Sequence, residues 1–98
     1  MTDEKCDKGV HAELANTVID AAARLDDLRL RAPGHGAVVS FQGTVRPVTK
    51  QGEPLEKLIL DHHPRMTLVS LQRIAEAGIR RFDVSAVSVV HRCGAMVP

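Results

Sequence analysis

Three side chains that can bind an anion follow two strand-like runs of the chain. Arg46 follows residues 36–45, and His91 and Arg92 follow residues 84–90. A guanidinium group presents a planar fork of N–H donors that suits a phosphate or a carboxylate. If the two runs are parallel strands of one sheet, their C-terminal ends meet at the same edge. We therefore expect Arg46, His91 and Arg92 to converge on one pocket that binds a small anion.

Each of these residues, taken singly, also fits a structural role. An arginine at a strand end is commonly solvated, and His91 could be an imidazole that is hydrogen-bonded at the end of an apolar strand. Further side chains could assist an anion site as secondary contacts. These are Phe41, Lys50, His62 and Arg65.

The same part of the chain contains residues that often bind metals. His62, His63, His91 and Cys93 offer imidazole and thiolate groups, which are good zinc ligands. Adjacent histidines on an extended chain project to opposite sides, however, and no second cysteine lies near Cys93 in sequence. We therefore expect no metal and no other cofactor. Cys93 is either an unreactive turn cysteine or a nucleophile that its cationic neighbours activate.

Hydrophobic spacing predicts the elements that position these residues. Apolar residues recur at helical spacing in the first third of the chain and again after Pro64, and the runs between and after them are rich in β-branched residues. The prediction is an α+β fold of order α-β-β-α-β, with a mixed sheet and helices on one face. The expected elements are a helix over 11–30, strands over 37–45 and 55–62, a helix over 64–81 and a strand over 84–90.

Length and composition restrict the class of protein. The chain has 98 residues, a formal charge of +1 and two aromatic side chains, so we expect one domain over 10–98, after a disordered polar stretch over 1–9, and no nucleic-acid partner. No secretory signal or membrane-length run is present in it, and its two cysteines do not form a disulfide framework. We expect a cytoplasmic protein. A homodimer is also expected, because pairing would cover an apolar edge strand.

The order and spacing of these pieces resemble the large, catalytic subunit of molybdopterin synthase, from about residue 36 to residue 98. In that family an arginine closes the segment that resembles 43–46, and a His-Arg pair closes a strand before a turn, as at 91–94. Residues 61–66 resemble the family's acidic-His-Tyr-Pro-Gly-Met signature. His62, Pro64 and Met66 match it, while His63 replaces the aromatic residue and Arg65 the glycine. The implied fold is the N-terminal part of the family's α/β hammerhead.

The resemblance also implies a function and a partner. Arg46, His91 and Arg92 are implied to bind cyclic pyranopterin monophosphate, beside the thiocarboxylated tail of the small, ubiquitin-like sulfur-carrier subunit. Sulfur from that tail forms the dithiolene of molybdopterin. The implied role is therefore in molybdenum cofactor biosynthesis.

Two lysines with implied catalytic roles lie in a C-terminal segment of the family for which this chain has no counterpart. The lysines here, Lys5, Lys8, Lys50 and Lys57, all precede that region, so no catalytic residue can be carried over. One reading is a short synthase subunit that is truncated at its C-terminus. The alternatives are a catalytically incomplete paralogue, acting as a binding and dimerisation module, and a fragment of a longer product.

Overall fold

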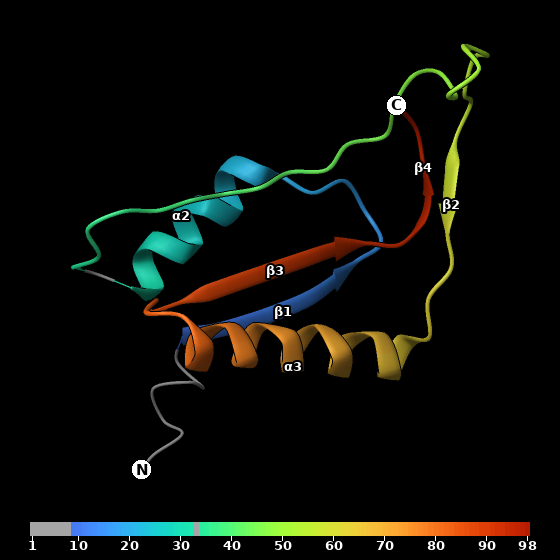
Figure 1. The fold of residues 1–98 in the computed structure, drawn as a ribbon. Coiled ribbons are helices and arrows are strands. Elements are labelled where there is room, and N and C mark those ends of the chain that lie inside the picture. The colour runs from blue at the N-terminus through green and yellow to red at the C-terminus, as the bar shows by residue number, and fades with distance from the viewer. Residues whose placement is uncertain (1–8, 33) are drawn as a thin grey trace.

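The computed structural model describes residues 9–32 and 34–98 of the chain. It contains two helices and two small sheets, one parallel and one antiparallel, so the expected mixed α+β class is confirmed. The expected disorder of residues 1–9 falls almost entirely outside the described residues. The elements, in chain order, are β1 (Val10–Ala15), α2 (Ala21–Arg31), β2 (Leu58–Leu60), α3 (Pro64–Arg81), β3 (Val87–Arg92) and β4 (Gly94–Met96) (Figure 1).

The centre of the molecule is a parallel pair of strands covered by a long helix. β1 pairs with β3 in a register that runs from Val10 opposite Val87 to Ala15 opposite Arg92, and α3 packs against both strands. One more backbone bond, from the Cys93 N–H to the Ala15 carbonyl at 2.9 Å, extends this ladder beyond β3. The core residues are Ala15, Ala75, Ile79 and Cys93.

The expected helix over 11–30 is wrong in its first half. Residues 10–15 form β1, and the helix begins only at Ala21, where the side chain of Asp20 accepts a hydrogen bond from the Ala23 N–H at 3.1 Å. The apolar residues Val10, Ala12 and Leu14 also alternate with period two, so the local pattern fits a strand as well as a helix. Pairing with the valine-rich β3 decides between the two, and no local signal reveals that partner.

The start of β1 also depends on a close approach of two backbones. A Cβ placed on Gly9 would lie 2.6 Å from the Ser85 carbonyl oxygen. Only glycine allows the chain to pass so near the loop that precedes β3.

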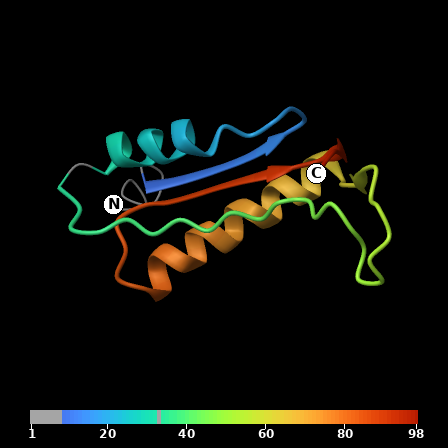
Figure 2. The same cartoon turned by 90° about the horizontal axis from the view of Figure 1, so that it is seen from above.

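The expected strand over 37–45 is not a strand in the structure. Residues 36–46 form an elongated, irregular stretch that runs beside β3 in the same direction, on the side of β3 away from β1 (Figures 1 and 2). Within the described part of the chain, no backbone hydrogen bond joins this stretch to β3. Its β-branched residues favour an extended backbone. A β-strand, however, also needs a neighbouring strand that forms backbone hydrogen bonds with it.

The second half of the chain follows the sequence pattern more closely. The helix expected over 64–81 is confirmed as α3, with Pro64 at its start and His63 as the N-cap residue. The strand expected over 55–62 is reduced to β2, and the one expected over 84–90 lies at 87–92 as β3. β4 was not expected. It follows a turn at Gly94, whose φ of 89° suits glycine, and pairs antiparallel with β2 (Figure 1).

The expectation that the helices share one face of the sheet is also wrong. α2 and α3 lie on opposite faces of the β1–β3 pair (Figures 1 and 2). After β1, the chain crosses one face of the pair through α2 and reaches the stretch 36–46, which lies beyond β3. It then returns across the other face through α3 to β3, which lies between β1 and that stretch. Two crossovers in opposite directions are both right-handed only if their helices lie on opposite faces. Neither helix in the described residues is long and apolar enough to cross a membrane.

Candidate functional site

The candidate anion-binding residues lie at one end of the molecule. β3 and the stretch 36–46 run in the same direction, so their C-terminal ends lie at the same end (Figure 1). α3 runs the opposite way, so its first turn, which carries Arg65 and follows His62, is also at this end. The C-terminal ends of parallel strands are the usual place for a ligand in such sheets.

His91 and Arg92 are neighbours on β3 but leave it in opposite directions. They lie opposite Leu14 and Ala15 of β1, and successive side chains of a strand point to opposite faces. His91 is exposed and Arg92 is half-buried. A ligand could therefore contact both side chains only by lying across the end of the strand.

Arg92 also has a structural role in the turn that it begins. Its guanidinium donates hydrogen bonds to the carbonyl of Cys93 and to that of Ala95, the latter at 3.1 Å. These bonds hold the turn at Gly94 that connects β3 to β4. A guanidinium has five N–H donors, so others remain for a ligand.

Arg46 differs from Arg92 in having an uncommitted side chain. It is exposed and immediately precedes Pro47, and no hydrogen bond or ion pair of its guanidinium appears among the residues that the structure describes. Arg46 is therefore able to reach a ligand without breaking an internal contact.

The secondary candidates are spread more widely. Phe41 is 95% exposed, and His62 and Arg65 are exposed near the start of α3. Lys50 lies in a separate turn, which a bond from the Gly52 N–H to the Thr49 carbonyl at 2.9 Å closes. His63, which the sequence offered as a possible metal ligand, caps α3 by accepting a hydrogen bond at Nδ1 from the Met66 N–H at 3.1 Å. Over residues 9–32 and 34–98, no three His, Cys, Asp or Glu side chains gather to hold a metal ion.

Cys93 is buried and makes a local structural contact. Its Sγ donates to the Ala15 carbonyl oxygen at 3.4 Å, the same oxygen that accepts the Cys93 N–H. A thiol in this position packs at the end of the β1–β3 ladder, which favours the structural alternative over the nucleophile.

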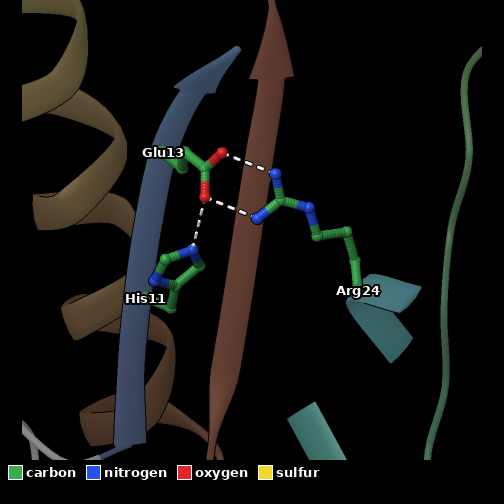
Figure 3. A network of polar contacts seen from close by, with 3 residues as sticks. All are labelled: His11, Glu13 and Arg24. Atoms are coloured by element: carbon green, nitrogen blue, oxygen red, sulfur yellow. Dashed lines mark hydrogen bonds and ion pairs between the residues drawn. The ribbon is translucent and has the colours of Figure 1, made fainter. Parts of the chain in front are cut away.

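A polar network that sequence reasoning missed connects β1 to α2 (Figure 3). The two terminal nitrogens of Arg24 donate to the two carboxylate oxygens of Glu13, each at 2.6 Å, and His11 Nε2 lies 3.0 Å from Glu13 Oε1. Hydrogen bonds from Arg24 and then from His11 hold the pKa of Glu13 below its ordinary value. The bond to Glu13 raises the pKa of Arg24 in turn. No signal in the sequence pointed to this network, because the pattern placed Glu13 on a helix.

We expect Glu13→Gln to lower stability at neutral pH by a small amount, because the network is partly exposed and screened by water. The depressed pKa of Glu13 favours the folded state above its unfolded pKa of about 4.3, and this contribution is lost as the pH falls through the lower, folded pKa. Thermal melts of both proteins across this range test the prediction. The difference in melting temperature between the two proteins should become smaller on acidification. A difference that stays constant below pH ~4 would contradict the role of the ionised carboxylate.

Two adjoining cavities separate the stretch 36–46 from β3 and α2. One, of about 640 Å³, is lined by residues 36–39 on one side and 83–88 on the other, with Leu28 of α2. The other, of about 520 Å³, is lined by residues 39–44 and 88–90, with Leu25 and Leu28 of α2. Both are open clefts between main-chain segments that run side by side.

Comparison with known proteins identifies the family to which the chain belongs. The family described as MoaE protein matches residues 14–98. The chain is 38% identical over 79 residues to the molybdopterin synthase catalytic subunit of Ralstonia nicotianae, which covers 81% of this chain and 44% of that protein. It is 34% identical over 79 residues to the protein of the same name from Rhizobium meliloti, covering 81% of this chain and 49% of the relative.

A third molybdopterin synthase catalytic subunit, from Haemophilus influenzae, is 41% identical over 59 residues, or 60% of this chain and 39% of that protein. The chain thus spans less than half the length of these curated relatives. No solved structure matches it. The match over residues 14–98 includes β3, α3, the stretch 36–46 and all three candidate anion-binding residues, and it shows that the chain belongs to the MoaE protein family.

Proposed function

We propose that this chain acts in molybdenum cofactor biosynthesis as the large subunit of a molybdopterin synthase, or as part of one. It would bind cyclic pyranopterin monophosphate and accept sulfur from the thiocarboxylated small subunit. The observation that carries the proposal is the family match over residues 14–98. The common end at which β3 and the stretch 36–46 finish supports a ligand site there.

The proposed site binds the precursor through its negative charge. Arg46 supplies an uncommitted guanidinium, His91 an exposed imidazole and Arg92 the N–H donors that its turn leaves free. Charge-assisted hydrogen bonds from such groups to a phosphate are short and strong. Phe41, His62 and Arg65 are proposed as secondary contacts. Lys50 is a weaker candidate, because it belongs to the turn at 49–52.

The chemistry assigned to these residues is binding and orientation. The sulfur arrives on the thiocarboxylate of the partner, so the site has no need of a sulfur nucleophile of its own, which agrees with the buried Cys93. Fixing the precursor next to the partner's tail converts the transfer to an effectively unimolecular step. A homodimer, a small sulfur-carrier partner and a cytoplasmic location belong to the same proposal.

A second candidate function is a binding module that holds the precursor and its partner but does not transfer sulfur. The described residues at the proposed site are guanidinium and imidazole groups, and no lysine amine is placed among them. Groups that stabilise negative charge during attack commonly contribute on the order of 10²-fold or more to the rate.

An assay of dithiolene formation distinguishes the two functions. It combines the purified 98-residue chain, the thiocarboxylated small subunit and the precursor. If catalysis depends on lysine amines that these residues do not supply, the chain should bind the precursor and convert it very slowly or not at all, at least ~10²-fold below a full-length family member measured in parallel. Turnover at the rate of that control would establish the synthase and would show that the catalytic groups are within these residues, with Lys50 and Lys57 to be tested first. Absence of both binding and turnover would overturn the proposal.

A further inference from the structure

The first turn of α3 is held by its cap more than by the core. The buried residues of this helix, Ala75 and Ile79, lie in its second half. In the first half, Met66 is 65% exposed and residues 68–70 are exposed as well. A helix end with so few tertiary contacts depends on side chains that satisfy its free backbone N–H groups.

Two reciprocal hydrogen bonds form this cap. Nδ1 of His63 accepts from the Met66 N–H at 3.1 Å, and Oγ1 of Thr67 accepts from the His63 N–H at 3.2 Å. The carbonyl of His63 accepts the first bond of the helix ladder, from the Thr67 N–H at 2.9 Å. The arrangement is similar to a capping box, in which two backbone donors at the helix start are satisfied reciprocally.

The bond to Met66 exists only while the imidazole of His63 is neutral. A backbone N–H can only donate, so Nδ1 of His63 must carry a free lone pair. In an imidazolium both ring nitrogens carry protons, and neither can accept. The proton also places a positive charge at the N-terminus of α3, where the helix dipole disfavours it and the first turn contains no acidic residue. Protonation therefore breaks the cap.

Two other histidines respond differently to the same proton. Nδ1 of His35 contacts the carbonyl oxygen of Ala32, which can only accept, so this bond survives in the imidazolium. Nε2 of His11 lies beside the Glu13 carboxylate, which attracts a protonated ring. Among the histidine hydrogen bonds of the described residues, the one at His63 is thus the one that acid breaks.

The charged groups next to His63 in its own segment do not replace the lost bond. Asp61 and His62 precede it and Arg65 follows it, and all three are exposed. Asp61 lies outside the helix, and no ion pair joins it to His63 in the part of the chain that the structure describes. Arg65 lies in the first turn, where its positive charge adds to that of an imidazolium.

The strands beside α3 supply no carboxylate to His63 either. The charged or titratable residues of β1 and β3, on which α3 packs, are His11, Glu13, His91 and Arg92. Glu13 points to α2, where it binds Arg24 (Figure 3), and alternation along the paired strands puts His11 and Arg92 on that same side. His91 lies on the side of α3 and is itself an imidazole. β2, which leads into this segment, and its partner β4 contain no titratable residue.

We propose that His63 makes the start of α3 a pH-sensitive element, capped when the imidazole is neutral and frayed when it is protonated. A free histidine gains its proton near pH ~6.5, so the stabilisation by the cap is present at pH ~8 and is lost toward pH ~5. The second half of α3 stays formed, because Ala75 and Ile79 hold it on the sheet. The proposal is independent of the proposed function, although the turn that loosens carries Arg65.

Thermal melts of the wild type, His63→Asn and His63→Ala between pH ~5 and pH ~8 test the proposal. Asparagine is a good N-cap residue that does not titrate, and alanine provides no cap. The wild type should melt close to His63→Asn at the alkaline end and close to or below His63→Ala at the acidic end. The difference between the wild type and His63→Asn should grow by roughly 4–8 °C on acidification, the effect of losing one N-cap in a domain of this size.

His62→Asn is the matched control, because His62 is an exposed neighbour with the same ring that does not cap the helix. It should keep the pH dependence of the wild type. NMR gives the local readout, in which the Met66 amide signal shifts together with the ring signals of His63 and stays fixed in His63→Asn. A pH-independent difference between the wild type and His63→Asn, or an equal change in His62→Asn, would overturn the proposal. A Met66 signal that ignores protonation of His63 would overturn it too.

Discussion

Arg46→Ala should weaken binding of cyclic pyranopterin monophosphate on the order of 10- to 100-fold, the effect of losing charge-assisted hydrogen bonds to a phosphate. Arg46 is the cleanest of the three candidates to test. Its side chain is exposed and has no internal partner among the described residues, so its removal should leave the fold intact. Arg92 holds the turn at Gly94, and its replacement would combine lost binding with a rearranged turn.

A calorimetric or fluorescence titration of the precursor against the purified chain measures this change. Arg73→Ala is the matched control. Arg73 is an exposed arginine on α3, and its replacement removes the same charge from the protein. The affinity of Arg73→Ala for the precursor should stay close to that of the wild type. If both variants lose the same amount of affinity, the effect comes from the overall charge of the protein and not from a specific contact. An unchanged affinity in Arg46→Ala would show that Arg46 does not contact the precursor.

Ile79→Ala should be the most damaging single truncation of an apolar side chain. Ile79 is 9% exposed in a core with few buried residues, where α3 packs on β1 and β3. Truncation of a buried isoleucine costs roughly 2–5 kcal/mol through lost transfer energy and the cavity left behind. For a domain of about this size, each kcal/mol lowers the melting temperature by roughly 4–8 °C, so the melting temperature should fall by at least ~8 °C.

Ile74→Ala provides the comparison, since it makes the same change on the same helix at a residue that is 67% exposed. Its effect should stay within about 0.5 kcal/mol. Thermal and urea unfolding of the two variants measures the difference. Equal destabilisation would mean that the surface carrying Ile74 is buried in solution, as in a dimer.

The sequence by itself determined α3, because its pattern is local. Pro64 starts the helix, and an apolar stripe continues to its end at Arg81, so no distant residue was needed to predict it. The family resemblance was equally local, since it depended on short motifs around Arg46, His62 and His91, and the family match over residues 14–98 confirms it. The anion site that those motifs imply stays a prediction.

Only the tertiary structure decided which segments become strands. Val10 to Ala15 fits both periods, and its pairing with β3 made it a strand. Residues 37–45 have a clearer strand pattern, but no backbone hydrogen bond joins them to a neighbouring strand in the described part of the chain. The Glu13–Arg24 pair and the opposite faces of the two helices follow from that pairing and from the direction of the crossovers. A helix closes its hydrogen bonds within one segment, so its sequence can predict it. A strand closes them with a partner far along the chain, and its own residues do not identify that partner.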